Sequence, residues 1–207
     1  NSGDFFDVGL TTVTYTATDG SGNETTCSFD VEVLDDELPT ISCNAPIETC
    51  SPFVTYDSPV SNDNCGVASV TMIEGLASGS DFPVGTTAVT YEVIDIHGNS
   101  NTCSFDVTIF PLPELTISVE DVSCFGFGDG ALDLTVTNGT EPYTFDWSNG
   151  ADTEDITMLE PGVYNVLVTD ANGCSTTASL SISQPSPLIA SLVGSTPVNC
   201  SGGYDGD

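Results

Sequence analysis

The sequence contains no lysine and no arginine, and its single histidine is the one side chain that could become positively charged near neutral pH. With 31 aspartate and glutamate residues, the 207-residue chain has a formal net charge of −31. Without basic side chains it cannot neutralise a nucleic-acid backbone, hold anionic lipid through a basic patch or clamp a carboxylate substrate with arginine. Nucleic-acid partners and lysine Schiff-base catalysis are therefore excluded.

Long apolar runs and helical periodicity are also missing. No stretch approaches the roughly 20 apolar residues of a membrane span, so we expect no membrane insertion in this segment. Nothing at Asn1 resembles a signal peptide. The chain is nevertheless 39% hydrophobic, which is too apolar for charge-driven disorder. Its eight cysteines indicate an oxidising, extracellular compartment.

Two kinds of internal repeat organise the chain. At an offset of 76, Phe6–Val31 and Phe82–Val107 are identical at 16 of 26 positions. A second type is marked by Glu120–Gly130, which is echoed by Thr196–Gly206. We therefore expect a segment of a longer array, divided into the C-terminal part of one unit (1–35), a complete unit (36–111), a complete unit of the second type (112–186) and the start of another (187–207).

The repeats have the pattern of short strands. Val89, Tyr91 and Val93 alternate with other residues, a period of two, and Gly- or Asn-containing turns follow every 8–12 residues. About seven strands in ~75 residues predict small Ig-like sandwiches, and Tyr164 after a Pro-Gly turn predicts a tyrosine corner. The proline-rich linker at 110–115 should be stiff. The predicted fold is all-β, with tandem Ig-like β-sandwich domains in an extended array.

The positions of the cysteines within the repeats predict a disulfide framework. No CxxC pair is present and histidine is scarce, so disulfides are favoured over zinc. First and last strands are neighbours in an Ig-like sandwich, which brings the outermost cysteines of each unit together. The predicted bonds are Cys43–Cys103, Cys50–Cys65 and Cys124–Cys174, while Cys27 and Cys200 should pair outside the segment.

Acidic and amide side chains gather at one predicted end of the complete first-type unit. The start of its first strand should share a pole with the loops after two other strands, and calcium prefers six to eight oxygen ligands. We therefore consider a calcium site there. The alternative is a solvated linker beside turns that cap their own backbone. The candidate ligands are Asp35, Asp36, Glu37, Asn62, Asp63 and Asp95, with Asn64 close by.

No set of residues predicts catalysis. A Ser-His-Asp triad would need His97, which lies in a turn without a nucleophile elbow nearby. Tyr143 and Trp147 could offer a sugar-stacking surface, but Phe145 shares their strand face, as in a sandwich core. We therefore expect no enzymatic activity, no cofactor other than calcium, and a core position for Trp147.

Two families resemble these repeats. FPVGTTAVTYEV, the Gly-Asn turn, TCSFDVTI and DNCG, within about 1–111, resemble the hyalin-repeat (HYR) domain, an extracellular Ig-like module. VSCFGFGDGALDLTV, EPYTFDWSNG and LEPGVYNVLVTDANGC, within about 112–207, resemble the SprB repeat of very large surface proteins of gliding Bacteroidota. These resemblances imply a bacterial cell-surface or secreted protein exported by the type IX system, and a role in gliding motility.

The most direct interpretation is a structural stalk segment of a large secreted or cell-surface adhesin or filament. Its disulfide-stapled domains would form an extended acidic rod whose partners are the neighbouring repeats of the same chain. One alternative is a calcium-dependent ligand- or carbohydrate-binding module that contacts a surface or glycan. Another is a filament subunit that associates with other copies of itself.

Overall fold

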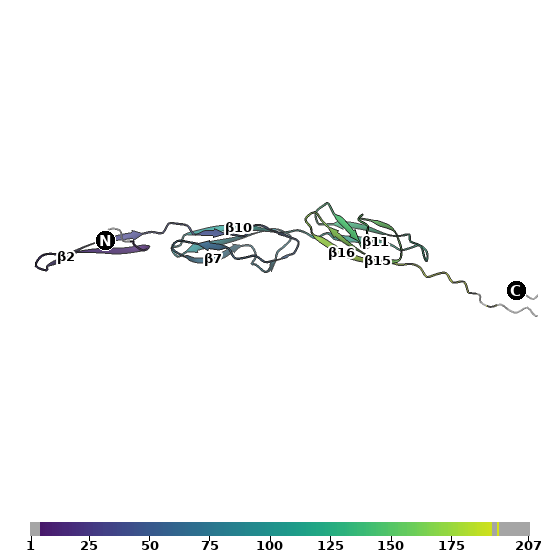
Figure 1. Ribbon diagram of the computed structural model, residues 1–207, viewed down its shortest axis with the longest axis horizontal. Coiled ribbons are helices and arrows are strands. Elements are labelled where there is room, and N and C mark those ends of the chain that lie inside the picture. The colour runs from purple at the N-terminus through teal and green to yellow at the C-terminus, as the bar shows by residue number, and fades with distance from the viewer. Residues whose placement is uncertain (1–4, 192–193, 195–207) are drawn as a thin grey trace, which may run out of the picture. The chain divides into compact units, whose positions relative to one another are not determined.

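The computed structural model describes residues 5–191 and 194, and every regular element in them is a β-strand (Figure 1). The all-β prediction is therefore confirmed. The contacts divide the chain into a first unit that ends at Phe110 and a second that begins at Pro111. The four predicted repeat units divide the chain more finely and remain predictions. Most of the predicted last repeat, 187–207, lies outside the described residues.

The first unit begins with a two-stranded hairpin, β1 (Gly9–Thr18) and β2 (Glu24–Val33). Its register pairs Tyr15 with Cys27, as β9 and β10 pair Tyr91 with Cys103. The side chains of Tyr15 and Phe29 stack with 6.1 Å between ring centroids, yet both remain more than half exposed. Tyr15 and Phe29 thus occupy positions that face the core in the complete repeat. Among the described residues, their side chains remain largely exposed.

The rest of the first unit is a small sandwich. A four-stranded sheet, in the order β4-β10-β9-β7, is accompanied by the two-stranded sheets β3-β6 and β5-β8. All pairs are antiparallel except β4 with β10. The strands are β3 (Thr40–Ser42), β4 (Ile47–Thr49), β5 (Phe53–Val54), β6 (Val60–Asn62), β7 (Val67–Glu74), β8 (Ser80–Asp81), β9 (Gly85–Asp95) and β10 (Ser100–Ile109).

The core of this sandwich forms because β9 and β10 bury alternate side chains, as the period of two predicted. Val89 and Val107 have no exposed surface, and Phe105 packs edge-on against Tyr56 with 5.1 Å between ring centroids. The buried cluster consists of Val54, Phe82, Val89, Phe105, Val107 and Ile109.

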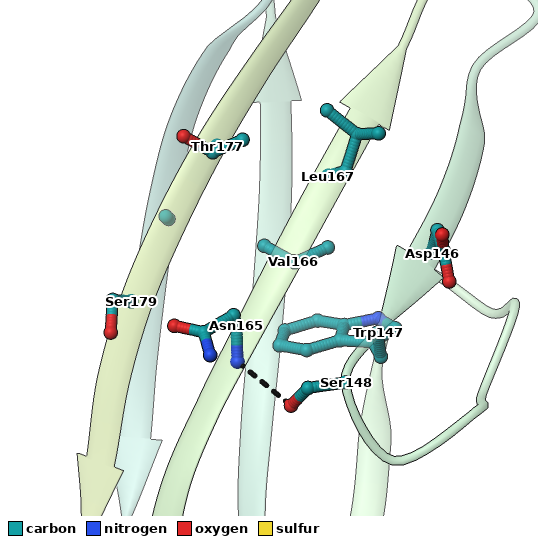
Figure 2. A pocket seen from close by; sticks show the side chains of 9 residues that line it. Asp146, Trp147, Ser148, Asn165, Val166, Leu167, Thr177 and Ser179 are labelled. Atoms are coloured by element: carbon teal, nitrogen blue, oxygen red, sulfur yellow. Dashed lines mark hydrogen bonds between the residues drawn. The ribbon is translucent and has the colours of Figure 1, made fainter.

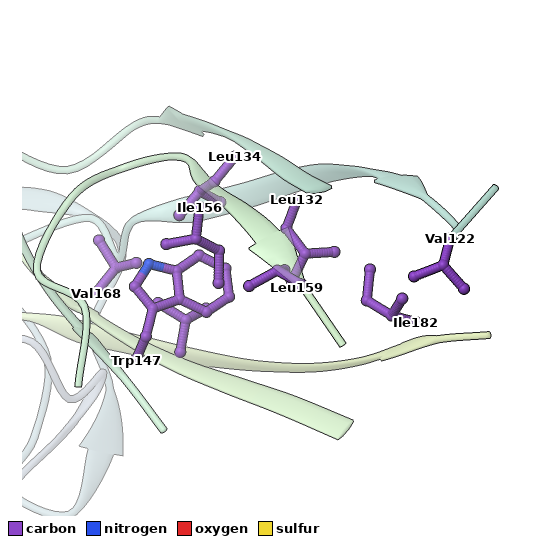
Figure 3. Packing of buried hydrophobic residues seen from close by; sticks show 9 residues of the cluster. Val122, Leu132, Leu134, Trp147, Ile156, Leu159, Val168 and Ile182 are labelled. Atoms are coloured by element: carbon purple, nitrogen blue, oxygen red, sulfur yellow. The ribbon is translucent and has the colours of Figure 1, made fainter. Parts of the chain in front are cut away.

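The second unit is a sandwich of two three-stranded antiparallel sheets, ordered β11-β12-β14 and β13-β15-β16. Trp147 is 2% exposed and packs among Leu132, Leu134 and Ile156 in the core between them (Figure 3). The strands are β11 (Glu114–Glu120), β12 (Gly130–Thr137), β13 (Thr144–Trp147), β14 (Ile156–Leu159), β15 (Gly162–Thr169) and β16 (Ser175–Ile182).

The tyrosine corner predicted from the sequence is present in this unit. The hydroxyl of Tyr164 donates a hydrogen bond of 3.0 Å to the carbonyl of Glu160, across the Pro161-Gly162 turn. The bond fixes the angle at which β15 begins and agrees with an Ig-like sandwich.

The main hairpin turn of each repeat is built around one aspartate: Asp19, Asp95 and Asp170. Each carboxylate accepts hydrogen bonds of 2.8–2.9 Å from the backbone N–H groups two and four residues later. The residue three positions after each aspartate is a glycine with φ between 81° and 96°, a region that glycine enters without steric cost. One carboxylate thereby satisfies two backbone N–H groups of the turn and sets the register of the two strands that the turn joins.

We predict that Asp170→Ala lowers the free energy of unfolding of the second unit by about 3 kcal/mol, since it leaves buried backbone donors unpaired. Besides its own turn, Asp170 accepts a hydrogen bond of 3.0 Å from the N–H of Thr140. Urea unfolding followed by Trp147 fluorescence reports on this unit, because the chain has one tryptophan.

The control is Asp152→Ala, which removes the same charge from an exposed position and should change stability by less than about 0.5 kcal/mol. Equal losses in the two variants would contradict the structural role of the Asp170 carboxylate.

Candidate functional site

The candidate site lies at the end of the first unit where β9 finishes. Asp95, the last residue of β9, is only 2% exposed. Its Oδ1 accepts hydrogen bonds from the N–H groups of His97 (2.8 Å) and Asn99 (2.9 Å), and its Oδ2 accepts one from Nδ2 of Asn99 (2.8 Å). Burial raises the pKa of Asp95, but the hydrogen bonds from Asn99 and His97 outweigh burial and hold it below its ordinary value. The carboxylate is therefore ionised at neutral pH.

Asp63 approaches from the loop between β6 and β7. Its Oδ1 accepts hydrogen bonds from the N–H groups of Cys65 (2.9 Å) and Gly66 (2.8 Å), which fix the side chain. Its Oδ2 is buried and has no hydrogen-bond partner among the described residues. A buried carboxylate oxygen without a partner costs free energy, so this atom needs a donor or a cation.

Asp35 comes from the segment that links β2 to β3, and its side chain is only 3% exposed. Its Oδ2 lies 2.9 Å from Nδ1 of His97, and its backbone carbonyl accepts a hydrogen bond of 3.1 Å from Nδ2 of Asn99. Asn101 holds the same segment through a bond of 3.0 Å to the carbonyl of Pro39. The β9–β10 hairpin therefore positions the incoming chain.

Carboxylate oxygens of Asp35, Asp63 and Asp95 all lie within 4.8 Å of one another. At an effective dielectric constant near 20, each such pair of charges repels by about 3 kcal/mol. The chain has no lysine or arginine to offset this repulsion. Asp35 also belongs to an overlapping group with Cys65 and His97 within the same distance limit. The site therefore combines concentrated negative charge with several metal-ligating atoms.

Three of the six residues predicted as calcium ligands meet here: Asp35, Asp63 and Asp95. Asp36 and Glu37 do not join them in a ligand group among the described residues. Oε2 of Glu37 accepts a hydrogen bond of 2.8 Å from Asn64 instead. Asn62 lies in β6, where its carbonyl accepts a bond from Thr40, and Asp36 is exposed.

Sequence reasoning missed Cys65, His97 and Asn99. Asn99 occupies the position of Asn23 in the 76-residue repeat and could have been found from the turn pattern. His97 replaces Ser21 and is exposed, as a turn residue should be, yet its ring reaches Asp35. Burial, a hydrogen bond to Asp35 and the neighbouring carboxylates raise the pKa of the Cys65 thiol.

The cysteines form only part of the predicted framework, which includes the Cys43–Cys103 bond. Cys43 and Cys103 are joined by a disulfide that closes a sequence separation of 60 residues. Cys27, Cys65 and Cys124 are free thiols. The predicted bonds Cys50–Cys65 and Cys124–Cys174 are therefore wrong. Cys200, whose partner was expected outside the segment, lies beyond the described residues.

The first incorrect bond fails because its cysteines lie at opposite ends of the first unit. Cys50 follows Thr49, which is paired with Ile109 at the end of β10. Cys65 lies beside the far end of β9, where Ile96 donates a hydrogen bond to Gly66. The 11 residues of β9 separate these ends by roughly 35 Å, far beyond the reach of a disulfide.

The same reason applies in the second unit. Cys174 lies directly before β16, in the Asp170 turn. Cys124 belongs to the loop at the other end of β16, where Gly126 donates a hydrogen bond of 3.0 Å to Gln184. The strand between them keeps the two cysteines apart.

A hollow of about 530 Å³ lies on the second unit beside β13, β15 and β16. Its lining includes Asp146, Asn165 and Ser179, and the N–H of Asn165 donates a bond of 3.0 Å to Oγ of Ser148 (Figure 2). The indole of Trp147 is buried and donates a bond of 2.9 Å to the carbonyl of Thr153. The predicted core position of Trp147 is confirmed, and its ring is not available for sugar stacking.

Comparison with family models identifies both repeat types. The HYR domain model matches residues 1–33 and 34–109, and the SprB repeat model matches residues 116–152. In the described part of the chain, no helix has the length and apolar character to cross a membrane.

The curated relatives described next each match about half of the chain. Sushi, von Willebrand factor type A, EGF and pentraxin domain-containing protein 1 of Rattus norvegicus is 37% identical over 110 residues, covering 50% of this chain and 3% of the relative. Hyalin of Lytechinus variegatus is 37% identical over 117 residues, covering 52% and 22%. Serine-rich adhesin for platelets of Staphylococcus aureus is 31% identical over 114 residues, covering 47% and 5%. The chain thus spans less than a quarter of each relative.

Among solved structures, the N-terminal eight Ig domains of Down syndrome cell adhesion molecule align with a TM-score of 0.54 at 14% identity. The alignment covers 86% of this chain and 31% of the other. This similarity confirms the Ig-like fold. The HYR and SprB matches and the hyalin and adhesin relatives above support an extracellular repeat segment of the adhesion type.

We predict that replacing both Cys43 and Cys103 by serine lowers the free energy of unfolding of the first unit by about 4 kcal/mol, because the disulfide closes a long loop in the unfolded chain. Differential scanning calorimetry of the full chain would measure the effect. Cys27→Ser, which alters an exposed free thiol, serves as the control. An unchanged transition in the double variant would show that the disulfide does not stabilise the unit.

Proposed function

Because the chain belongs to the HYR domain family and continues into a SprB repeat, we propose that it is a structural stalk segment of a large extracellular adhesin or filament. Within that protein its role is mechanical: the repeats space and support a binding region elsewhere and transmit tension to it. The SprB resemblance favours a bacterial cell surface as the location.

The observation that carries this proposal is the position of the Cys43–Cys103 disulfide. The chain enters the first sandwich through β3, which ends at the residue before Cys43. It leaves the sandwich through β10, which contains Cys103. Tension applied to the two ends of the sandwich therefore passes through the covalent bond. The residues between the two cysteines are bypassed by the load.

Hydrogen bonds protect the short stretches that the disulfide leaves outside the loop. The last residues of β10 pair in parallel with β4, and the N–H of Phe110 donates a bond of 2.9 Å to the carbonyl of Thr49. On the incoming side, Thr40 and Ser42 of β3 pair with β6. When the chain is pulled along these strands, the hydrogen bonds between them lie across the direction of force. They must then break together, which favours resistance to tension.

Charge and linker chemistry support an extended arrangement of the repeats. A net charge of −31 without basic residues makes the chain repel itself, and Pro111 and Pro113 stiffen the linker between the two repeat types. Both features favour a rod-like spacer over a collapsed cluster.

Single-molecule pulling of the full chain tests the mechanical role. With the disulfide intact, unfolding of the first sandwich should release little length. After reduction, the 60-residue separation should add roughly 200 Å of contour length.

Variants separate the effect of losing this disulfide from the effect of reducing any other. The double variant Cys43→Ser, Cys103→Ser should show the long step without reductant, whereas Cys65→Ser should keep the short step. If the intact protein already released the long step, the bond would not lie on the load path and the proposal would fail.

Small-angle scattering tests the spacer arrangement. A compact globule of 207 residues has a radius of gyration of about 17 Å, and we expect a clearly larger value. Replacing Pro111 and Pro113 by glycine should broaden the distribution of distances by loosening the linker. A compact value would contradict the stalk, and a mass that rises with concentration would indicate self-association instead.

A further inference from the structure

We propose that Asp35, Asp63 and Asp95 bind one calcium ion at the end of the first unit. The proposal goes beyond the stalk function, because it assigns a ligand to a specific group of side chains. It starts from three separate segments of the chain, the incoming linker, the β6–β7 loop and the β9–β10 turn, which deliver a carboxylate oxygen to the same place.

The second observation is the unpartnered oxygen of Asp63. Its Oδ2 is buried and has no hydrogen-bond partner among the described residues, while Oδ1 is fixed by two backbone N–H groups. The side chains of Asp35 and Asp95 are almost fully buried. Most buried polar atoms in proteins have a partner, so an orphan oxygen beside two more carboxylates points to a cation as the partner.

The spacing of the oxygens fits calcium. Calcium–oxygen distances are about 2.3–2.6 Å, so oxygens on opposite sides of one ion lie up to about 5 Å apart. The three carboxylate oxygens lie within 4.8 Å of one another. Magnesium requires a near-ideal octahedron at about 2.0–2.1 Å and usually keeps several waters, whereas calcium accepts several carboxylates in flexible geometry, so a set of three protein carboxylates favours calcium.

The overlapping group of Asp35, Cys65 and His97 offers one sulfur and one nitrogen, which suit zinc better than calcium. Asp63, which carries the orphan oxygen, belongs to the group of three carboxylates and not to this mixed group. The ring nitrogen Nδ1 of His97 already forms a hydrogen bond with Oδ2 of Asp35. The observations therefore favour the all-oxygen set.

The consequence of binding is local. Asp35 belongs to the linker, whereas Asp63 and Asp95 belong to the sandwich, so one ion joins the incoming chain to the body of its own domain. It also replaces the mutual repulsion of three carboxylates by attraction. The linker of this repeat then gains stiffness where the chain has no lysine or arginine to supply an ion pair.

The test is a titration of the full ¹⁵N-labelled chain with calcium chloride after treatment with EDTA, followed by NMR. The amides of Cys65, Gly66, His97 and Asn99 donate to the proposed ligands. We expect them to shift together along one saturating curve, with a dissociation constant of about 0.1–1 mM, as in other extracellular calcium modules.

The Asp19 turn is an internal control. It makes the same backbone hydrogen bonds but belongs to no three-ligand group among the described residues. The amides of Ser21 and Asn23 should therefore stay nearly unchanged. Equal shifts in both turns would mean general binding to acidic turns and would overturn the proposal.

Asp63→Asn provides the matched variant, since asparagine keeps the oxygen that accepts from Cys65 and Gly66. At ten times the dissociation constant, calcium should raise the unfolding midpoint of the parent's first unit by about 5–10 °C. Asp63→Asn should abolish this increase without lowering the midpoint in EDTA, because it also relieves repulsion. The exposed variant Asp106→Asn should retain the full increase.

Three outcomes would overturn the assignment. The first is the absence of any saturable shift with calcium. The second is an equal loss of the calcium effect in Asp106→Asn, which would indicate screening of the overall charge. The third is stabilisation by zinc chloride that disappears in Cys65→Ser but persists in Asp63→Asn, which would assign the site to the mixed sulfur and nitrogen group.

Discussion

The hydrogen bonds between one aspartate carboxylate and the backbone of its own hairpin turn are the interaction on which each repeat depends. Asp19, Asp95 and Asp170 supply it in the three hairpins, and two of the three are the buried charged residues of the described chain. A carboxylate that accepts two backbone N–H groups fixes the turn and therefore the register of the two long strands. Since register decides which side chains face the core, the packing of each sandwich follows from this turn.

The β9–β10 turn also positions the carboxylates of the candidate site in the first unit. Asp95 is held rigidly by its own loop, and the neighbouring amides of Asn99 and Asn101 hold the incoming linker. The same hairpin therefore organises both the fold and the collection of carboxylates. At the other end of the unit, the parallel pairing of β4 with β10 secures the exit of the chain. The proposed calcium ligands and the proposed load-bearing strand pair thus lie at opposite ends of one small domain.

Much of this arrangement follows from the sequence. The period of two predicted the strands, the Pro-Gly turn predicted the Tyr164 corner, and Ig-like topology predicted that three distant aspartates would meet. Adjacent residues of an extended segment point in opposite directions, so Asp35 could turn inward only if Asp36 turned outward. The pattern alone does not say which of the two does so. Two of the three predicted cysteine pairings failed for a related reason: repeat positions indicate which strands are neighbours, as for Cys43 and Cys103, but not at which end of a strand a loop cysteine lies.

The surroundings of Cys65 have a chemical consequence for the covalent framework. Thiol–disulfide exchange requires a thiolate as the attacking group, and burial together with the neighbouring carboxylates raises the pKa of this thiol. Once the domain has folded, Cys65 therefore stays protonated at neutral pH and is a poor nucleophile. The Cys43–Cys103 bond is thereby protected from attack by a free cysteine of its own domain, and the fold preserves the pairing that it selected.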